Sequence, residues 1–250
     1  TFFTKLGYRV VLSPYSSRKI YEMGIESIPS ESECYPAKLV HGHIEKLIDE
    51  GNKVIFYPCQ SYNIDEGLGD NHYNCPIVAY YPQNILNNVG KINDITFISD
   101  FIALDNKEMF VVKIKEILDK YFKGISKKEI KNASEKAYQE YDKYLSYIRE
   151  TATDFIKIAR ERKQEIIVLS GRPYHQDPQV NHGIDKLIAG MGATVISEES
   201  ISHLTKKFRV GVLNQWTYHS RLYAAAKYCT KEPDMNLVQL VSFGCGLDAV

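Results

Sequence analysis

The sequence lacks several features that would restrict its class at once. Its 31 basic residues equal its 31 acidic residues, so no long-range electrostatic field favours nucleic acid or an anionic membrane. No run reaches the roughly 18 to 20 consecutive apolar residues that a membrane helix needs. The first residues, TFFTKLGYRVVLS, also lack the basic stretch and apolar run of a secretory signal. We therefore expect a cytoplasmic protein with no nucleic-acid partner and no membrane partner.

Two common motifs are missing as well. The sequence has no C-x-x-C pair of the kind found in ferredoxins and zinc ribbons. It also has no GxxxxGK[ST] loop, so we do not expect this domain to hydrolyse ATP itself. The chain starts without a methionine and stops soon after an apolar run, which indicates a piece cut from a longer polypeptide.

Cysteine is present in an odd number, which argues against a disulfide framework in a chain without a secretory signal. The thiols are therefore either reduced side chains or metal ligands. The five are Cys34, Cys59, Cys75, Cys229 and Cys245.

Short apolar runs alternate with helical patterns in two stretches of the chain, which predicts βαβ units and parallel sheets. Between these stretches, residues 107–163 have a continuous helical pattern with a break at 123–126. We predict an α/β protein of two doubly wound, flavodoxin- or Rossmann-like lobes, at 1–106 and 164–250, joined by a helical connector at 107–163. Strands are predicted at 8–14, 53–59, 76–82, 94–101, 165–171, 193–197 and 236–246, and helices at 18–23, 35–51, 180–191 and 215–228.

Three cysteines occupy positions where ligands collect in open parallel sheets. Cys59 ends one predicted strand, Cys245 ends another, and Cys34 opens a helix whose N-terminus would favour the thiolate. Cys75 lies at the end of the polar loop after Cys59 and could return to the same crevice. Each of the four stands beside Pro, Gly or a turn-forming residue, whereas Cys229 lies on an amphipathic helix and is expected to pack in a core.

Several longer motifs resemble a known family. The sequence resembles the domain of unknown function (DUF2229-type) found with the activators of 2-hydroxyacyl-CoA dehydratases, which is similar to the cluster-binding subunits of 2-hydroxyglutaryl-CoA dehydratase and benzoyl-CoA reductase. The motifs that carry the resemblance are IPSESECYPAKLVHGHI, IFYPC, NHYNCP, SGRPYH, NHGI, LNQWTYHSRLY and VSFGCGLDA.

The resemblance implies an iron–sulfur cluster of the 4Fe-4S or double-cubane type, held in a cleft between the two lobes. By position, Cys34 and Cys59 match the early pair of ligands and Cys245 the late one. Cys75 is an additional thiol, so the fourth ligand is open among Cys75, water, substrate and a sulfide that bridges to a second cluster. The resemblance also implies an ATP-dependent activator as partner, an acyl-CoA ligand and low-potential electron transfer. It is compatible with a protein that forms dimers.

Five other residues are candidates to lie near the cluster or a substrate. Arg172 in SGRPYH could offer a fixed positive charge to a phosphate, a carboxylate or a reduced cluster. His41 and His72 could donate a hydrogen bond or move protons, and Lys38, one turn after Cys34, could offset negative charge. His175, together with His182 and His219, stands in the matched motifs. Each residue also has a plain structural alternative, as a surface ion pair or a satisfied buried side chain.

Three functions remain open from the sequence. The first is an iron–sulfur domain of a dehydratase-like or ATP-dependent reductase system. The second is an α/β module that docks or regulates the activator, with cysteines that only pack. The third, a structural Cys₄ zinc site, is disfavoured because paired cysteine knuckles are absent. The sequence does not decide whether the domain is itself catalytic.

Overall fold

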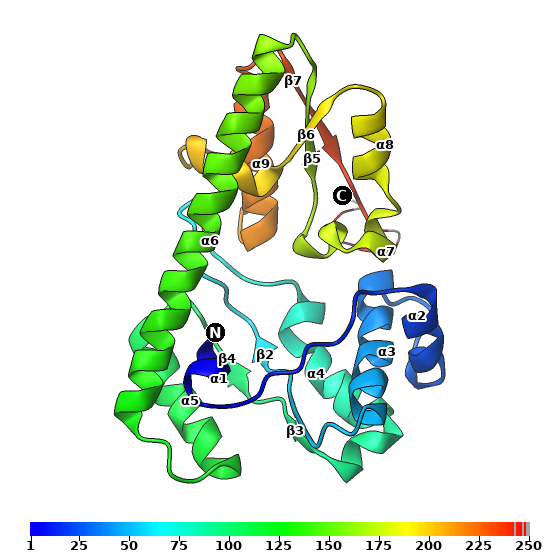
Figure 1. The fold of residues 1–250 in the computed structure, drawn as a ribbon, viewed down its shortest axis with the longest axis vertical. Coiled ribbons are helices and arrows are strands. Elements are labelled where there is room, and N and C mark those ends of the chain that lie inside the picture. Colours follow the sequence, from blue (N-terminus) through cyan, green and yellow to red (C-terminus); the bar gives the residue numbers. More distant parts are fainter. Residues whose placement is uncertain (243, 247, 249–250) are drawn as a thin grey trace. The chain divides into compact units, whose positions relative to one another are not determined.

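The computed structural model describes residues 1–242, 244–246 and 248. These residues form two compact units. The first comprises residues 1–64, 74–141 and the described part of 243–250, and the second comprises 65–73 and 142–242. Both contain helices and parallel strands (Figure 1), which confirms the mixed α/β class. None of the described helices is long and apolar enough to cross a membrane.

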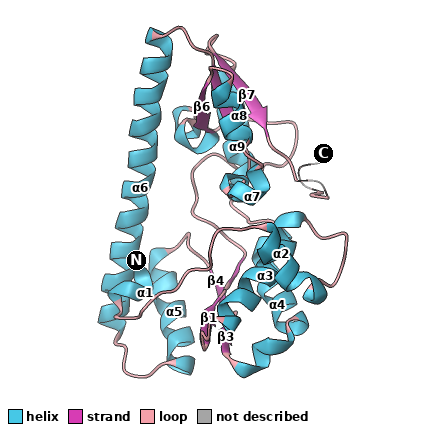
Figure 2. Ribbon diagram, turned by 45° about the vertical axis from the view of Figure 1, so that its right-hand side comes forward, coloured by secondary structure: helices cyan, strands magenta, loops and turns pink. Residues whose placement is uncertain are grey.

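The first unit is mostly helical, and Figure 2 shows how few of its residues are strand. Its strands are short, and its last helix, α6, continues into the second unit. The helices are α1 (Phe2–Lys5), α2 (Arg18–Gly24), α3 (Tyr35–Asp49), α4 (Pro76–Asn88), α5 (Lys107–Tyr121) and α6 (Lys127–Glu161), and the strands are β1 (Val54–Phe56), β2 (Cys59–Gln60), β3 (Thr96–Ile98) and β4 (Phe101–Ile102).

The four strands of the first unit form one interrupted parallel ribbon. Strand β1 pairs with β3 and β2 pairs with β4 in the same register, so that Val54 lies opposite Thr96 and Cys59 opposite Phe101. The interruption falls at Pro58, which has no N–H to donate. On either side of it, Tyr57 N–H donates to Ile98 O at 3.0 Å and Cys59 N–H to Asp100 O at 3.2 Å. The ribbon therefore carries Cys59 into the interior at a fixed position.

The ribbon separates two apolar cores, because successive side chains of a strand point to opposite faces. Ile55 of β1 packs with Ile44 of α3 and Ile85 of α4. On the other face, Ile98 of β3 packs with Ile114 of α5 and other buried residues of α5 and α6. The first unit is thus a thin parallel layer between two helical layers.

The second unit contains a three-stranded parallel sheet in the order β6-β5-β7. Its core joins the sheet to α9 and to the second half of α6 through Ile166, Val168, Ile196, Ala225 and Cys229. The strands are β5 (Ile166–Ser170), β6 (Thr194–Ser197) and β7 (Met235–Gln239), and the helices are α7 (Pro178–Asn181), α8 (Ile184–Gly190) and α9 (Thr217–Cys229). The finer prediction of two doubly wound lobes, and the lobe boundaries, stay predictions.

The strands predicted at 53–59, 94–101, 165–171 and 193–197 each contain an observed strand, but two others are wrong. Residues 8–14 have no regular structure, and Leu12 is 82% exposed. The ring of Tyr8 packs against Phe3 and Phe122, whereas the ladder of β1 runs to β3. An apolar run without a neighbouring strand has nothing to pair with, so its β propensity has no effect.

The run at 76–82 is the start of helix α4 and not a strand. Pro76 occupies the first turn, where its missing N–H would have no intrahelical partner. The buried side chains Ala79, Pro82 and Ile85 recur at a helical spacing. The strand predicted at 236–246 ends at Gln239. Residues 243, 247, 249 and 250 of the last motif lie outside the described residues.

Candidate functional site

Two of the cysteines cap helices in the first unit. Cys34 is the N-cap residue of α3 and Cys75 that of α4, and in both helices a proline stands in the first turn. The Cys75 Sγ accepts a hydrogen bond from Val78 N–H at 3.5 Å. A thiol at a helix N-terminus lies at the positive end of the helix dipole. The sequence predicted this environment for Cys34 and missed it for Cys75.

Cys59 has a different environment, because it is fully buried on β2. Burial raises the pKa of the Cys59 thiol, and hydrogen bonding from Gln83 of α4 opposes that rise. The Gln83 amide donates to Cys59 Sγ at 3.9 Å and to Ser99 Oγ at 3.2 Å. Without a metal, this environment favours the neutral thiol.

Two tyrosines lie near these three thiols, the half-buried Tyr57 and the buried Tyr81. Burial raises the pKa of Tyr57, and the charges of Cys59 and Cys75 raise it further. For Tyr81 the causes of a raised pKa are burial, then Glu33, and then the smaller effects of Tyr57 and Cys34. The pKa of each tyrosine is therefore raised by the charge of at least one thiol. The first unit brings Cys34, Cys59 and Cys75 into one neighbourhood.

Cys245 belongs to the same unit, although it lies near the end of the chain. It is buried, but it does not end a strand as predicted, because β7 stops at Gln239. A Cβ atom on the preceding residue, Gly244, would lie 3.8 Å from the carbonyl oxygen of Ser32. The chain beside Cys245 thus contacts the chain just before Cys34. Cys229 lies on α9 and packs in the core of the second unit, as expected.

In residues 1–242, 244–246 and 248, no three His, Cys, Asp or Glu side chains are close enough together to bind one metal ion. A tetrahedral zinc site needs four donors around a single ion. The four cysteines of the first unit therefore share a region without forming a cage for one ion.

A buried hydrogen-bond chain begins beside Cys34. The Tyr81 hydroxyl donates to Glu33 Oε2, and it accepts from His41 Nε2–H at 2.8 Å. His41 Nδ1 lies 2.8 Å from Ser27 Oγ, which donates to Gly24 O at 2.9 Å. We place a hydrogen on His41 Nε2 because the one hydrogen of the Tyr81 hydroxyl goes to Glu33. Burial lowers the pKa of His41, against the opposing effect of the Glu33 charge, and thus favours the neutral ring.

Tyr81→Phe should destabilise the first unit by about 1 to 3 kcal/mol, because Glu33 and His41 would both lose a buried partner. The free energy of unfolding in urea measures the effect. Tyr80→Phe is the matched control, since Tyr80 is the preceding residue on α4 and is 55% exposed. Equal stability of the two variants would show that the chain contributes nothing measurable.

The other two candidates near the cysteines lie in different surroundings. Lys38 Nζ binds the Glu31 carboxylate at 3.0 Å and the Glu31 carbonyl oxygen at 2.8 Å. This ion pair is the plain alternative that the sequence left open for Lys38. His72 is half-buried in segment 65–73, which belongs to the second unit. The structure thus groups His41 with the cysteines through Glu33 and does not group His72 with them.

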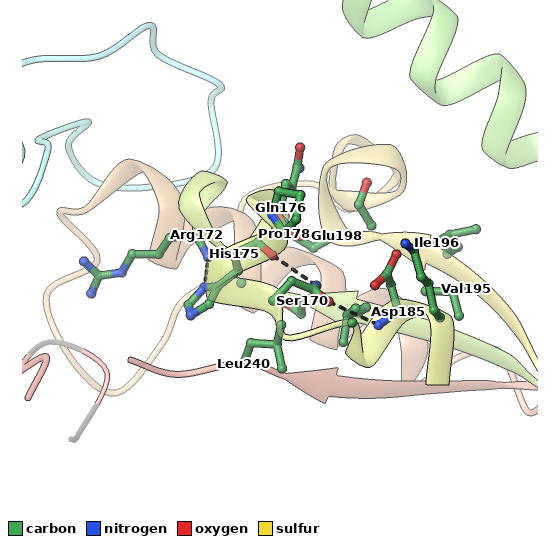
Figure 3. Close-up of a pocket in the computed structure, with 16 residues that line it drawn as sticks. Ser170, Arg172, His175, Gln176, Pro178, Asp185, Val195, Ile196, Glu198 and Leu240 are labelled. Carbon is green, nitrogen blue, oxygen red and sulfur yellow. Dashed lines mark hydrogen bonds between the residues drawn. The ribbon is translucent and has the colours of Figure 1, made fainter. Parts of the chain in front are cut away.

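The second unit has a cavity of about 380 Å³ at the carboxyl end of its parallel sheet. Ser170, Glu198 and Leu240, at or just beyond the ends of β5, β6 and β7, all line it. This edge of a parallel sheet is where α/β proteins bind ligands. Figure 3 shows Ser170 and His175 between Arg172 on one side and Asp185 on the other.

The SGRPYH motif forms one wall of this cavity. His175 Nδ1 accepts from Arg172 N–H at 3.0 Å, so the neutral ring carries its proton on Nε2. Gly171 is required here, because a Cβ atom at this position would lie 2.6 Å from His175 Nδ1. The Arg172 guanidinium is buried, and its Nη2 lies 3.3 Å from His219 Nε2 of α9. The structure therefore groups Arg172, His175 and His219 in the second unit.

A buried cluster of acids around Arg221 was not found from the sequence. Arg221 of α9 binds Glu66 through two N–H groups, one of them Nε at 3.1 Å from Oε2. Its Nη1 lies 3.9 Å from Glu198 Oε1 and 3.7 Å from Glu199 Oε1. Burial opposes the charge of Arg221, but these carboxylates raise its pKa. The available signal was an arginine on the same helical stripe as Ala225 and Cys229, which are core residues.

Glu198 should make stability depend on pH. Burial raises the pKa of Glu198 to about 7, against the opposing charge of Arg221. The ordinary pKa of a glutamate is 4.5. Between pH 4.5 and about pH 7, the folded protein therefore binds more protons at Glu198 than the unfolded chain does. The free energy of unfolding should therefore fall as the pH rises through this range, by up to about 3 kcal/mol from this group. Urea unfolding of Glu198→Gln at several pH values should show a smaller change of the free energy of unfolding with pH. Glu161→Gln, an exposed control on α6, should show the same pH dependence as the wild type.

The fold and these sites define an α/β protein with a thiol-rich first unit and a second unit whose parallel sheet ends in a polar cavity. A sequence profile of the family described as CoA enzyme activase uncharacterised domain (DUF2229) matches residues 1–201. The chain belongs to this family, as its motifs indicated. No curated protein and no solved structure matches the chain significantly. Cys34, Cys59 and Cys75 lie inside the matched range, and Cys245 and Arg221 lie beyond it.

Proposed function

We propose that the first unit of this activase-family domain holds an iron–sulfur cluster on Cys34, Cys59, Cys75 and Cys245. The observation that carries the proposal is that one unit contains all four cysteines, with Cys34, Cys59 and Cys75 each near Tyr57 or Tyr81 and the chain at Cys245 beside Ser32. Thiolates are the usual ligands of such clusters. Two of the four stand at helix N-termini.

The donor chemistry suits a cluster better than a single ion. A cluster sits between its cysteines with several iron and sulfide atoms, so its ligands stand further apart than ligands around one ion. The lack of a three-donor cage among the described residues is compatible with this arrangement. When bound, the cluster would supply low-potential one-electron chemistry. The chain's own contribution would be burial, the two helix N-termini and the Glu33–Tyr81–His41 hydrogen bonds beside Cys34.

In this proposal the domain acts with an ATP-dependent activator and passes electrons toward an acyl-CoA or a similar substrate that is hard to reduce. The activator and the substrate class are proposed on family membership. The alternative is a module that docks on or regulates the activator with cysteines that only pack. The burial of Cys59 and its raised pKa favour that alternative for this one residue.

Cysteine variants should separate the two functions. After oxygen-free reconstitution with iron and sulfide, Cys34→Ser, Cys59→Ser, Cys75→Ser and Cys245→Ser should each lose at least half of the bound iron and of the visible absorption, because each removes one thiolate ligand. Cys229→Ser is the control and should keep both. Iron and absorption that are unchanged in all four variants would favour the docking module.

A further inference from the structure

Two hydroxyl groups are buried in the second unit without a hydrogen-bond partner among the described residues. They are Ser170 Oγ and Thr217 Oγ1, and the two residues are 1% and 4% exposed. Native structures seldom bury a polar group without a partner, because the lost hydration is not replaced. Each hydroxyl therefore indicates a partner outside the described residues.

Both hydroxyls border the place where the loop after β5 meets α9. Ser170 is the last residue of β5, and Thr217 is the first residue of α9. Arg172, two residues after Ser170, reaches His219 in the first turn of α9, with 3.3 Å between Nη2 and Nε2. The N-cap of α9 is Trp216, which makes no side-chain capping hydrogen bond. The two hydroxyls and the buried guanidinium thus belong to the β5 loop and to α9, which meet through the Arg172–His219 contact.

We propose that this place binds an oxyanion group, a carboxylate or a phosphate, of a small molecule. Helix α9 has 13 residues and carries a positive partial charge at its N-terminus, where the Thr217 N–H donates to Tyr73 O at 3.0 Å. A guanidinium makes strong charge-assisted hydrogen bonds to carboxylate and phosphate oxygens, and two hydroxyls supply further donors. The guanidinium, the two hydroxyls and the positive end of α9 together suit an anion.

The adjoining cavity provides room for the rest of the molecule. Ser170, Arg172 and His175 line the cavity of about 380 Å³ at the carboxyl end of the sheet (Figure 3). Glu198 also lines it, and its negative charge is offset by Arg221 at 3.9 Å. This inference involves none of the proposed cluster ligands, so it stands or fails independently of the iron–sulfur proposal.

Thermal unfolding of the full chain of residues 1–250 tests the site. The Tm is measured with sodium phosphate or sodium acetate and compared with the Tm in sodium chloride at the same ionic strength. Binding to the folded state raises Tm in a saturable manner. We expect the Ser170→Ala, Thr217→Val double variant to weaken this response at least tenfold in anion concentration. Its Tm without added anion should equal or exceed that of the wild type, because two unpaired hydroxyls are removed.

Arg172→Gln should abolish the response, and Arg162→Gln, an exposed arginine at the end of α6, should leave it intact. A response to phosphate alone or to acetate alone would support the site and identify its anion. No saturable response to either anion would overturn the proposal, as would a response that the double variant keeps in full. A double variant with a lowered Tm and an unchanged anion response would show that the hydroxyls are structural. If Arg172→Gln does not fold, the double variant still decides.

Discussion

Gly42→Ala is expected to destabilise the first unit by about 3 kcal/mol, because α2 and α3 are in backbone contact where they cross. A Cβ atom on Gly42 would lie 1.7 Å from the carbonyl oxygen of Ile20. A Cβ atom on Gly24, across the crossing, would lie 2.2 Å from the backbone nitrogen of Gly42. Backbone atoms cannot move aside as a flexible side chain can, so the two helices must separate.

The separation would also disturb the neighbourhood of the cysteines, since His41 directly precedes Gly42 on α3 and Cys34 caps the same helix. Urea unfolding followed by far-ultraviolet circular dichroism measures the loss. Gly190→Ala is the control, because Gly190 lies in helix α8 and a Cβ atom there has no neighbour within 4 Å. That variant should be as stable as the wild type or more stable, by up to about 1 kcal/mol. A Gly42→Ala protein as stable as the wild type would contradict the crossing.

Arg221→Met is expected to lower the free energy of unfolding by about 3 to 5 kcal/mol at pH 7, because it leaves buried carboxylates without their cation. Glu66, Glu198 and Glu199 all depend on this guanidinium. Glu66 lies in segment 65–73, which belongs to the second unit although its flanking residues belong to the first. Loss of Arg221 should therefore also release this segment and speed its amide hydrogen exchange.

Arg160→Met is a matched control, since Arg160 also binds two acids, Glu232 at 2.6 Å and Asp234 at 2.7 Å. The side chain of Arg160 is 44% exposed, so its ion pairs are screened by water and worth about 1 kcal/mol or less. The defect of Arg221→Met should shrink as the pH falls below 7, because Glu198, whose pKa is about 7 even beside Arg221, then takes up a proton. Equal losses for the two arginines would contradict the buried cluster.

The sequence predicted those features that depend on local pattern. The capping position of Cys34, the strands around Cys59 and the grouping of Arg172 with His175 follow from turn chemistry and apolar periodicity over a few residues. The run at 76–82 was assigned to a strand because short apolar runs suit a buried strand and a helix equally well. The proline at 76 and the spacing of Ala79, Pro82 and Ile85 carried the helical signal.

Long-range contacts could not be derived from local pattern. Nothing near Glu33 in the sequence indicates that Tyr81 would reach it, 48 residues away. The same is true of Arg221 and Glu66, which are 155 residues apart. The sequence predicted Cys245 at the end of the last strand, because that strand was expected to extend to residue 246. Strand β7 ends six residues before Cys245. These contacts depend on how whole elements pack, and the composition of each segment does not specify that.

Iron and acid-labile sulfide analysis of the protein purified without oxygen, combined with electron paramagnetic resonance of the dithionite-reduced sample, tests the central claim most directly. The account predicts a brown protein with about four irons or more per chain and a signal that is lost in Cys34→Ser and kept in Cys229→Ser. A colourless protein without iron, from iron-replete and oxygen-free expression, would contradict the claim, and stoichiometric zinc in its place would do the same.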